Sequence, residues 1–184
     1  MISFKKGNLL EDESEALVNT VNCVMGKGIA LQFKKAFPDN FKEYKKACDK
    51  KKVVPGKMFI FKHKDMFSYK WIINFPTKRH WKGKSKIEDI DSGLKDLVKQ
   101  VKKINIKSIA IPPLGSGLGC LDWEVVKSKI VSAFGKDEDI RINIYEPIGS
   151  PSSKKNAHQN QKTQYDERKS TIIEASSDLF LPRL

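Results

Sequence analysis

Cysteine and histidine are scarce in the sequence, and their scarcity limits the chemistry that the protein can use. There are three residues of each type among 184. The cysteines, Cys23, Cys48 and Cys120, form no CxxC pair, and no histidine accompanies them at the spacing of a zinc site. We therefore expect reduced thiols and neither a metal site nor a cofactor.

Long apolar segments are also absent from the sequence. No run approaches the roughly 18 apolar residues that a membrane helix needs. The first ten residues contain lysines and a Gly-Asn turn where a signal peptide would be apolar. The sequence therefore predicts a soluble, cytoplasmic protein that does not contact membranes.

Positive charge, by contrast, is abundant. The 35 Lys and Arg residues outnumber the 22 Asp and Glu residues, which gives a formal charge of +13. Such an excess favours a polyanionic partner, such as nucleic acid or a phosphorylated ligand, although a lysine-rich composition can have other origins.

The chain length suits one domain with a sizeable core, followed by a tail. After Pro147 the sequence becomes polar and loses any apolar period. We expect a domain over residues 1–148. Over residues 149–184 we expect a polar linker and a short C-terminal segment that is largely disordered or docks on a partner.

Strand-like and helix-like patterns alternate within the predicted domain. The β-type runs span Ile2–Lys5, Ala16–Val21, Lys57–His63, Trp71–Phe75, Lys107–Ile111 and Ile140–Tyr145. Helical patterns cover residues 28–37, 38–50 and 87–101 and the segment after Asp122, a predicted N-cap. The alternation predicts an α/β fold in which a mixed sheet with several parallel strands carries helices on both faces.

The glycine-containing segment "NTVNCVMGKGIA" follows the second predicted strand. In open α/β sheets, ligands bind beyond the carboxyl ends of the strands. Asn19 and Asn22 provide amide groups at this strand end. Gly26 and Gly28 allow a tight turn into a helix N-terminus, where free N–H groups favour an anion.

A second such segment, "IPPLGSGLGCLDW", follows the fifth predicted strand. Its glycines, Gly115, Gly117 and Gly119, stand at alternate positions and allow a backbone nest around a phosphate. Neither segment has the P-loop pattern, which disfavours hydrolysis of nucleoside triphosphates. Each segment alone is more often a plain turn, but two of them at one sheet edge predict a ligand cleft.

Cationic residues gather after the fourth predicted strand, in "FPTKRHWKGKS". On a protein so rich in lysine, a solvated loop is the ordinary explanation. The alternative is that Lys78 is a catalytic lysine at the mouth of the cleft. Arg79 and His80 would then supply like charge, which favours the free amine that nucleophilic attack requires.

Five blocks in order, "GNLL", "EALVNTVNCVMGKGIALQFKKAFP", "FPTKRHW", "IPPLGSGLGCLDW" and "IYEP", closely resemble a macrodomain. More narrowly, the sequence resembles the DNA ADP-ribosyl glycohydrolase branch, the antitoxin of DarT/DarG-type systems, which is similar to the human terminal ADP-ribose protein glycohydrolase. The resemblance spans residues 1 to about 147. It implies a three-layer α/β/α sandwich with a mixed sheet of about six strands and with ADP-ribose in a cleft at the strand ends.

The resemblance also implies an activity and partners. The expected protein is a monomeric hydrolase that removes ADP-ribose from thymidine-linked sites in single-stranded DNA, as the antitoxin of a cognate DNA ADP-ribosyltransferase toxin. The alternatives are an ADP-ribose-binding macrodomain without catalysis, a hydrolase of protein-linked ADP-ribose and a phosphatase acting on ADP-ribose phosphates. A general nucleic-acid binder would explain the charge but not the two glycine segments.

Carried onto this sequence, the family pattern makes Lys78 the catalytic lysine. It would attack the anomeric carbon of the distal ribose or its ring-opened aldehyde. The predicted DNA-binding residues are Arg79, His80, Trp81, Lys82 and Lys84. The predicted ligand-binding residues are Asn8, Leu9, Asn19, Asn22, Gly26, Lys27, Gly28, Ile29, Thr77, Pro113, Leu114, Gly115, Ser116, Gly117, Leu118, Gly119 and Tyr145.

The sequence departs from the family pattern at two positions. Many macrodomains have Asp where this chain has Asn8, which affects the adenine contact. The human relative carries an aspartate in the second glycine segment as general acid or base, whereas the aligned residue here is Gly119. Because Asp122 reads better as a helix cap, a Lys/Asp pair is not predicted, and the proton is left to water, a substrate group or Lys78.

Overall fold

The computed structural model describes residues 1–64, 69–80, 82–135, 137 and 139–147. The predicted linker and C-terminal segment, residues 149–184, lie outside the described residues and stay a prediction. Within the described part, no helix combines the length and the apolar composition that crossing a membrane requires. Nor do three His, Cys, Asp or Glu side chains of that part come together in a group that could hold a metal ion.

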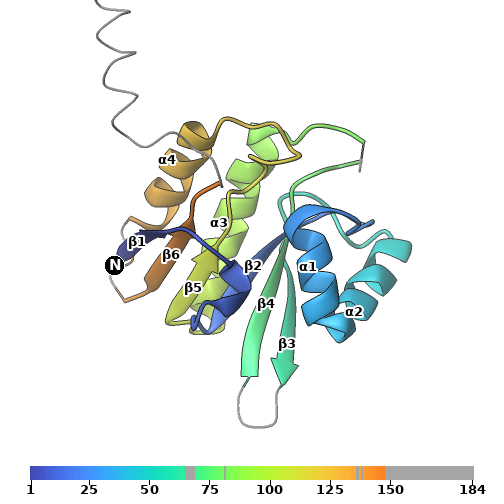
Figure 1. Ribbon diagram of the computed structural model, residues 1–184, viewed down its shortest axis with the longest axis horizontal. Helices are drawn as coiled ribbons and strands as arrows, with labels where there is room; N and C mark the ends of the chain where they lie inside the picture. Colours follow the sequence, from blue (N-terminus) through green and yellow to red (C-terminus); the bar gives the residue numbers. More distant parts are fainter. Residues whose placement is uncertain (65–68, 81, 136, 138, 148–184) are drawn as a thin grey trace, which may run out of the picture. The chain divides into compact units, whose positions relative to one another are not determined.

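Six strands form one mixed sheet, in the order β1-β6-β5-β2-β4-β3 (Figure 1). Neighbouring strands run parallel, except that β3 is antiparallel to β4. The α/β class and the mixed sheet of six strands are thereby confirmed. Because β2, β4 and β5 are adjacent and parallel, their carboxyl ends meet at one edge of the sheet. The strands are β1 (Ile2–Lys5), β2 (Ala16–Val21), β3 (Phe59–Lys64), β4 (Tyr69–Pro76), β5 (Ser108–Ile111) and β6 (Arg141–Tyr145).

Two pairs of helices cover the two faces of this sheet (Figure 1). Successive residues of β2 point to opposite faces. Val18 packs in the cluster that contains side chains of α3 and α4, whereas Leu17 packs with Phe33 of α1. The three-layer α/β/α arrangement is therefore confirmed. The helices are α1 (Gly28–Ala36), α2 (Pro38–Asp49), α3 (Ile87–Lys103) and α4 (Trp123–Phe134), and a short 3₁₀-helix that was not predicted, η1, spans Leu9–Glu11.

The apolar period of α3 explains why this helix forms and where it packs. Ile90, Leu94, Leu97 and Val101 recur at three- or four-residue steps, and all four side chains are buried in the core under the sheet. Full burial of each such side chain stabilises the fold by about 1.5–3 kcal/mol. The apolar spacing that predicted α3 therefore also provides the side chains that pack this helix against the sheet.

The prediction of reduced thiols is wrong for two of the three cysteines. Cys23, two residues after β2, forms a disulfide with Cys48 in the last turn of α2, and their Cα atoms lie 5.7 Å apart. The two residues are 25 positions apart in the sequence. Their approach therefore comes from the packing of α2 beside the end of β2, which no local spacing rule encodes. Cys120 is a free, exposed cysteine.

Candidate functional site

Three segments meet at the carboxyl edge of the sheet. The parallel register pairs Val21 of β2 with Pro76 of β4, so that Asn22 and Thr77 leave the sheet side by side. One residue later, Lys78 reaches toward the loop that follows β5, where its Nζ donates a hydrogen bond to the Leu118 carbonyl at 2.6 Å. The predicted catalytic lysine and the predicted phosphate loop are therefore in direct contact.

The first glycine loop, residues 22–28, is shaped mainly by side chains. Oδ1 of Asn22 accepts hydrogen bonds from the backbone N–H groups of Val24 at 2.8 Å and Met25 at 3.1 Å. This is an Asx turn, in which the side chain replaces a backbone acceptor. Met25 has a left-handed φ of 47° and is fully buried. The loop is thus held at its start by an amide and in its middle by a core side chain.

The first glycine loop ends at the N-terminus of α1. Gly28, the first helical residue, has a φ of +59°, and a Cβ there would meet nothing within 4 Å. Within the described part of the chain, the N-cap residue Lys27 makes no side-chain capping bond. Lys27 therefore leaves the first backbone N–H groups of α1 without a side-chain cap, an arrangement that suits an anionic ligand.

The second glycine loop, residues 113–121, is held by backbone hydrogen bonds. The N–H of Leu121 donates to the Gly115 carbonyl at 3.1 Å, and the N–H of Ser85 donates to the Gly119 carbonyl at 3.0 Å. Gly115 has a left-handed φ of +68°. Gly117, at the exposed turn of the loop, has open space where a Cβ would stand. A ligand can therefore approach the backbone closely at Gly117.

Gly119 has no room for a side chain. A Cβ at this position would lie 2.2 Å from the Gly115 carbonyl oxygen and 2.3 Å from Oγ of Ser85. An aspartate could not occupy position 119 without a change in the loop. Asp122 is instead the N-cap of α4, and its Oδ1 accepts the Val125 N–H at 3.0 Å. The side chain of Asp122 is thus engaged at the start of α4.

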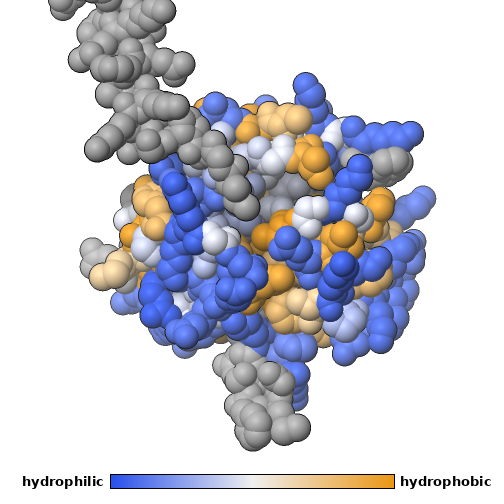
Figure 2. Space-filling view, in the orientation of Figure 1, coloured by the Kyte–Doolittle hydropathy of each residue, from blue (hydrophilic) through white to orange (hydrophobic). Residues whose placement is uncertain are grey.

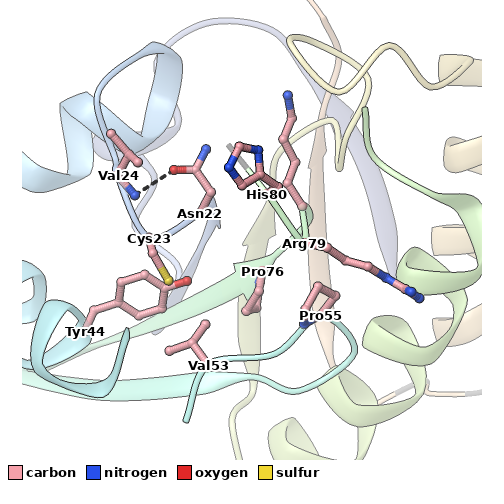
Figure 3. A pocket seen from close by; sticks show the side chains of 10 residues that line it. Asn22, Cys23, Val24, Tyr44, Val53, Pro55, Pro76, Arg79 and His80 are labelled. Atoms are coloured by element: carbon pink, nitrogen blue, oxygen red, sulfur yellow. Dashed lines mark hydrogen bonds between the residues drawn. The ribbon is translucent and has the colours of Figure 1, made fainter. Parts of the chain in front are cut away.

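A cavity of about 140 Å³ lies beside Lys78 (Figure 3). It is bordered by the first glycine loop, by α2 and the segment that follows this helix, and by the end of β4. Four of its residues belong to the predicted site, and the other six were not predicted. The lining residues are Asn22, Cys23, Val24, Tyr44, Val53, Pro55, Pro76, Lys78, Arg79 and His80.

The missed residue Tyr44 belongs to a stripe along α2. Asn40, Tyr44 and Cys48 stand at four-residue steps and therefore share one helix face. Asn40 is hydrogen-bonded to Asn74 of β4, with donor–acceptor distances of 2.7 and 3.3 Å, and Cys48 forms the disulfide. Two polar residues and a cysteine on a buried face weaken an apolar pattern. The four-residue spacing itself was the signal that could have indicated this face.

Several predicted ligand residues do not present their side chains to the cleft, and Asn19, Leu114 and Tyr145 are the clearest cases. Asn19 lies within β2 rather than at its end, is fully buried, and donates to Oδ1 of Asn74 at 3.1 Å. Leu114 is fully buried in the core. Tyr145 is buried too, and its hydroxyl donates to Oδ2 of Asp12 at 2.9 Å. The first two side chains serve the interior of the fold, and the third serves a buried polar cluster.

A buried polar cluster surrounds Asp12 and includes Tyr145, a predicted ligand residue. Burial alone would raise the pKa of Asp12, but hydrogen bonds from Ser14, Lys5 and Tyr145 hold that pKa well below its usual range. Burial, together with the bond to Asp12, raises the pKa of Tyr145 to about 12. Asn8 caps η1 nearby in the sequence, where its side chain accepts the Leu10 N–H at 3.1 Å.

The basic segment after β4 is only partly available to a ligand. Arg79 forms a two-point ion pair with Asp89 of α3, with Nε–Oδ2 and Nη2–Oδ1 distances of 3.0 and 2.8 Å, and this carboxylate raises the pKa of Arg79. The charge of Arg79 is thus locally compensated, which weakens its predicted influence on Lys78. Nδ1 of His80 accepts the Lys82 N–H at 3.3 Å. Trp81, a predicted DNA contact, lies outside the described residues.

The lysines that follow in this segment remain at the surface. Lys82, Lys84 and Lys86 are all exposed. Figure 2 shows hydrophilic residues over most of the visible face of the protein, with smaller hydrophobic groups near its middle. Exposed lysines next to a cleft are suited to contacts with a phosphate backbone.

Comparisons with known proteins give consistent results. The model of the Macro domain family matches residues 18–130. A curated relative from Mycobacterium tuberculosis, named DNA ADP-ribosyl glycohydrolase, is 52% identical over 151 residues, which are 81% of this chain and 43% of the relative. A relative from Thermosipho africanus, named DNA ADP-ribosyl transferase-DNA ADP-ribosyl glycohydrolase fusion protein, is 37% identical over 164 residues, which are 80% of this chain and 42% of the relative. The chain thus spans less than half the length of these curated relatives.

Solved structures show the same similarity. The macrodomain of Mycobacterium tuberculosis DarG superimposes with a TM-score of 0.78 at 52% identity, covering 80% of this chain and 98% of that one. Thermosipho africanus DarTG in complex with ADP-ribose superimposes with a TM-score of 0.75 at 37% identity, covering 82% of this chain and 42% of that one.

Proposed function

The chain belongs to the macrodomain family, and on that premise we propose that it is an ADP-ribosyl glycohydrolase that removes ADP-ribose from thymidine-linked sites in DNA. The names of its relatives support the reaction class. The observation that carries the proposal is the position of Lys78. Its amine contacts the second glycine loop and its side chain lines the cavity beside Asn22.

The two glycine loops hold the ligand in this proposal. The diphosphate lies against the free N–H groups at the start of α1 and against the backbone around Gly117, which both loops leave open. The distal ribose then lies between Asn22 and Lys78, because these residues leave neighbouring strands. ADP-ribose thus spans the carboxyl edge of the sheet, as ligands do in open α/β folds.

Lys78 is the nucleophile of the proposed reaction. The free amine attacks the anomeric carbon of the distal ribose, a new C–N bond to lysine forms, and the bond from that carbon to the base breaks. The base leaves with the bonding electron pair and takes up a proton. Water then cleaves the bond between the sugar and the lysine, which releases ADP-ribose and restores the amine.

A lysine substitution tests the assignment. Lys78→Ala should abolish the release of ADP-ribose from a modified thymidine oligonucleotide, while calorimetry shows an affinity for free ADP-ribose within about tenfold of the wild type, or roughly 1.4 kcal/mol. Lys95→Ala, at an exposed position of α3, is the matched control and should behave as the wild type.

The possible outcomes separate an enzyme from an ADP-ribose-binding protein without activity. A wild type that binds ADP-ribose but releases none from DNA is such a binding protein. Full turnover by Lys78→Ala would assign the chemistry to another group. ADP-ribosylated protein, tested in parallel as a substrate, distinguishes a DNA hydrolase from a hydrolase of protein-linked ADP-ribose.

DNA contact is a further part of the proposal. The exposed side chains of Lys82, Lys84 and Lys86 follow Lys78 and would hold the DNA backbone beside the cleft. Affinity for modified single-stranded DNA should then fall with added salt, at a log–log slope of about −0.7 per phosphate contacted. Neutralising the three lysines together should flatten that slope and spare ADP-ribose binding. An unchanged slope would mean that this segment does not contact DNA.

The proposed partner is a DNA ADP-ribosyltransferase toxin, whose modification this chain reverses. The fusion of a transferase and a glycohydrolase in the Thermosipho africanus relative supports this pairing. Co-expression tests it directly. The active protein should restore growth to cells that express such a transferase, and the Lys78→Ala variant should restore it less.

A further inference from the structure

The cavity beside Lys78 is bordered by the start of the first glycine loop, at Asn22, Cys23 and Val24, and does not include the positions proposed to hold the diphosphate, which are the N-terminus of α1 and Gly117. Lys78 connects the two regions, because its side chain lines the cavity while its Nζ contacts the carbonyl of Leu118 in the second glycine loop. In the substrate, the anomeric carbon joins ADP-ribose to the base. The base must therefore lie within a few bonds of the carbon that Lys78 attacks, and the cavity is next to that position.

The size and the lining of the cavity suit a single aromatic ring. A cavity of about 150 Å³ with apolar walls accommodates one six-membered ring, and this cavity measures about 140 Å³. Figure 3 shows Tyr44, Val53 and Pro55 along its lower side, and Asn22 and His80 along its upper side. Apolar walls with a few polar groups are the usual composition of a site for a small organic ligand.

Tyr44 contributes a hydroxyl that needs a partner. Its side chain is 1% exposed, and within the described part of the chain its hydroxyl has no hydrogen-bond partner. Such buried polar groups are rare, and each calls for an explanation. Figure 3 shows the hydroxyl pointing from α2 toward the middle of the residues that line the cavity. Because burial raises the pKa of Tyr44, the hydroxyl keeps its proton and remains a donor.

Building on the proposed function, we propose that this cavity is the subsite for the departing base and that the Tyr44 hydroxyl donates a hydrogen bond to a carbonyl oxygen of that base. Asn22 and His80 border the same space from the opposite side and define its width. The glycine loops then bind the ADP-ribose, and the cavity binds the DNA base to which the ADP-ribose is attached.

The subsite assists the bond cleavage as well as binding. When the bond between the anomeric carbon and the base nitrogen breaks, the electron pair moves onto the base and spreads to its carbonyl oxygens. A hydrogen bond from Tyr44 to one of these oxygens becomes stronger as the negative charge develops. Because such a bond stabilises the transition state more than the bound substrate, its removal lowers kcat as well as kcat/KM.

Two substitutions in the cavity test this proposal. Tyr44→Phe removes only the hydroxyl, and it should lower kcat/KM on a modified thymidine oligonucleotide by about tenfold or more. Val53→Trp fills the cavity and should lower kcat/KM at least as much. Val125→Trp adds the same bulk at an exposed position of α4 and should have no effect. Calorimetry with free ADP-ribose should give wild-type affinity for all three variants, because the base is absent from that ligand.

The outcomes distinguish this proposal from the proposed function. If the wild type releases no ADP-ribose from DNA, the proposed function is wrong and the subsite is wrong with it. If the wild type is active and both cavity variants match it, only the subsite is wrong. If the cavity variants lose ADP-ribose affinity and turnover in equal proportion, Tyr44 and Val53 support the ADP-ribose cleft, and the base does not occupy this cavity.

Discussion

The two glycine loops meet at one edge of the sheet but are held by different means. Side chains stabilise the first loop, through the Asn22 amide, the Cys23–Cys48 disulfide and the buried Met25. Backbone hydrogen bonds stabilise the second loop, in which Gly119 is packed against the Gly115 carbonyl and Ser85. Glycine therefore has two functions at this edge of the sheet. Gly28 and Gly117 leave open space at the surface, whereas Gly119 leaves space for the protein itself.

Breaking the disulfide should have the largest effect on stability. The covalent bond closes a loop of 25 residues, and the chain-entropy relation for a loop of that length gives about 3.5 kcal/mol. Cys48→Ser should therefore lower the free energy of unfolding, measured by urea denaturation, by about 2–4 kcal/mol. Adding a reductant to the wild type should lower it similarly and should leave the Cys48→Ser variant unchanged. Equal stability of the reduced and oxidised wild type would show that side chains other than the disulfide hold the first loop.

A methyl group at position 119 should have the next largest effect. In Gly119→Ala the new Cβ would stand 2.2 Å from the Gly115 carbonyl oxygen, so the second loop must shift. Overpacking of this kind costs about 1–3 kcal/mol of the free energy of unfolding. Affinity for ADP-ribose should fall at the same time, because the shifted loop is the one proposed to bind the diphosphate. Thermal denaturation and calorimetry on one preparation would measure both effects.

Gly28→Ala should cost less, and for a different reason. No atom obstructs a Cβ at Gly28, but its φ of +59° is unfavourable for any residue with a side chain. We expect a loss of about 1 kcal/mol in the free energy of unfolding. If Gly28→Ala proves as damaging as Gly119→Ala, the contrast between the two loops does not hold.

The smallest effect on stability is expected at Gly117, where the two functions of glycine separate. A Cβ there meets nothing within 4 Å, so Gly117→Val should change the free energy of unfolding by no more than about 0.5 kcal/mol. Affinity for ADP-ribose should nevertheless fall by about tenfold or more, since the branched side chain keeps the diphosphate from the backbone. Wild-type affinity in this variant would place the ligand elsewhere.

Most of the fold could be predicted because its signals are local. β1 and β2 begin and end at the residues that their β-type patterns predicted, and Asp122 caps α4 as its position indicated. The parallel order of the strands then brings Asn22, Lys78 and the second glycine loop together, as the rule for open α/β sheets predicts. These features depend on residues that are close in the sequence or on a general topological rule.

The rest of the site depends on contacts between distant segments. Glycines 26 and 119 look alike in the sequence, but a Cβ at Gly119 would collide with the Gly115 carbonyl and Ser85, whereas a Cβ at Gly26 would only touch Val24 at 3.5 Å. The Cys23–Cys48 bond requires the packing of α2, and Tyr44 enters the cavity through the same packing. Such contacts are set by tertiary structure, so local sequence patterns do not predict them.

The antiparallel strand β3 has a consequence for how the protein behaves in concentrated solution. It is the last strand in the sheet order, and β1 is the first, so each has one side without a neighbouring strand of this sheet. Exposed backbone groups of that kind can pair with another chain and start aggregation. β3 carries exposed Lys62 and Lys64, and β1 ends at exposed Lys5. Lysine side chains on both outer strands disfavour pairing with a second copy, so part of the lysine content protects the sheet against edge-to-edge aggregation.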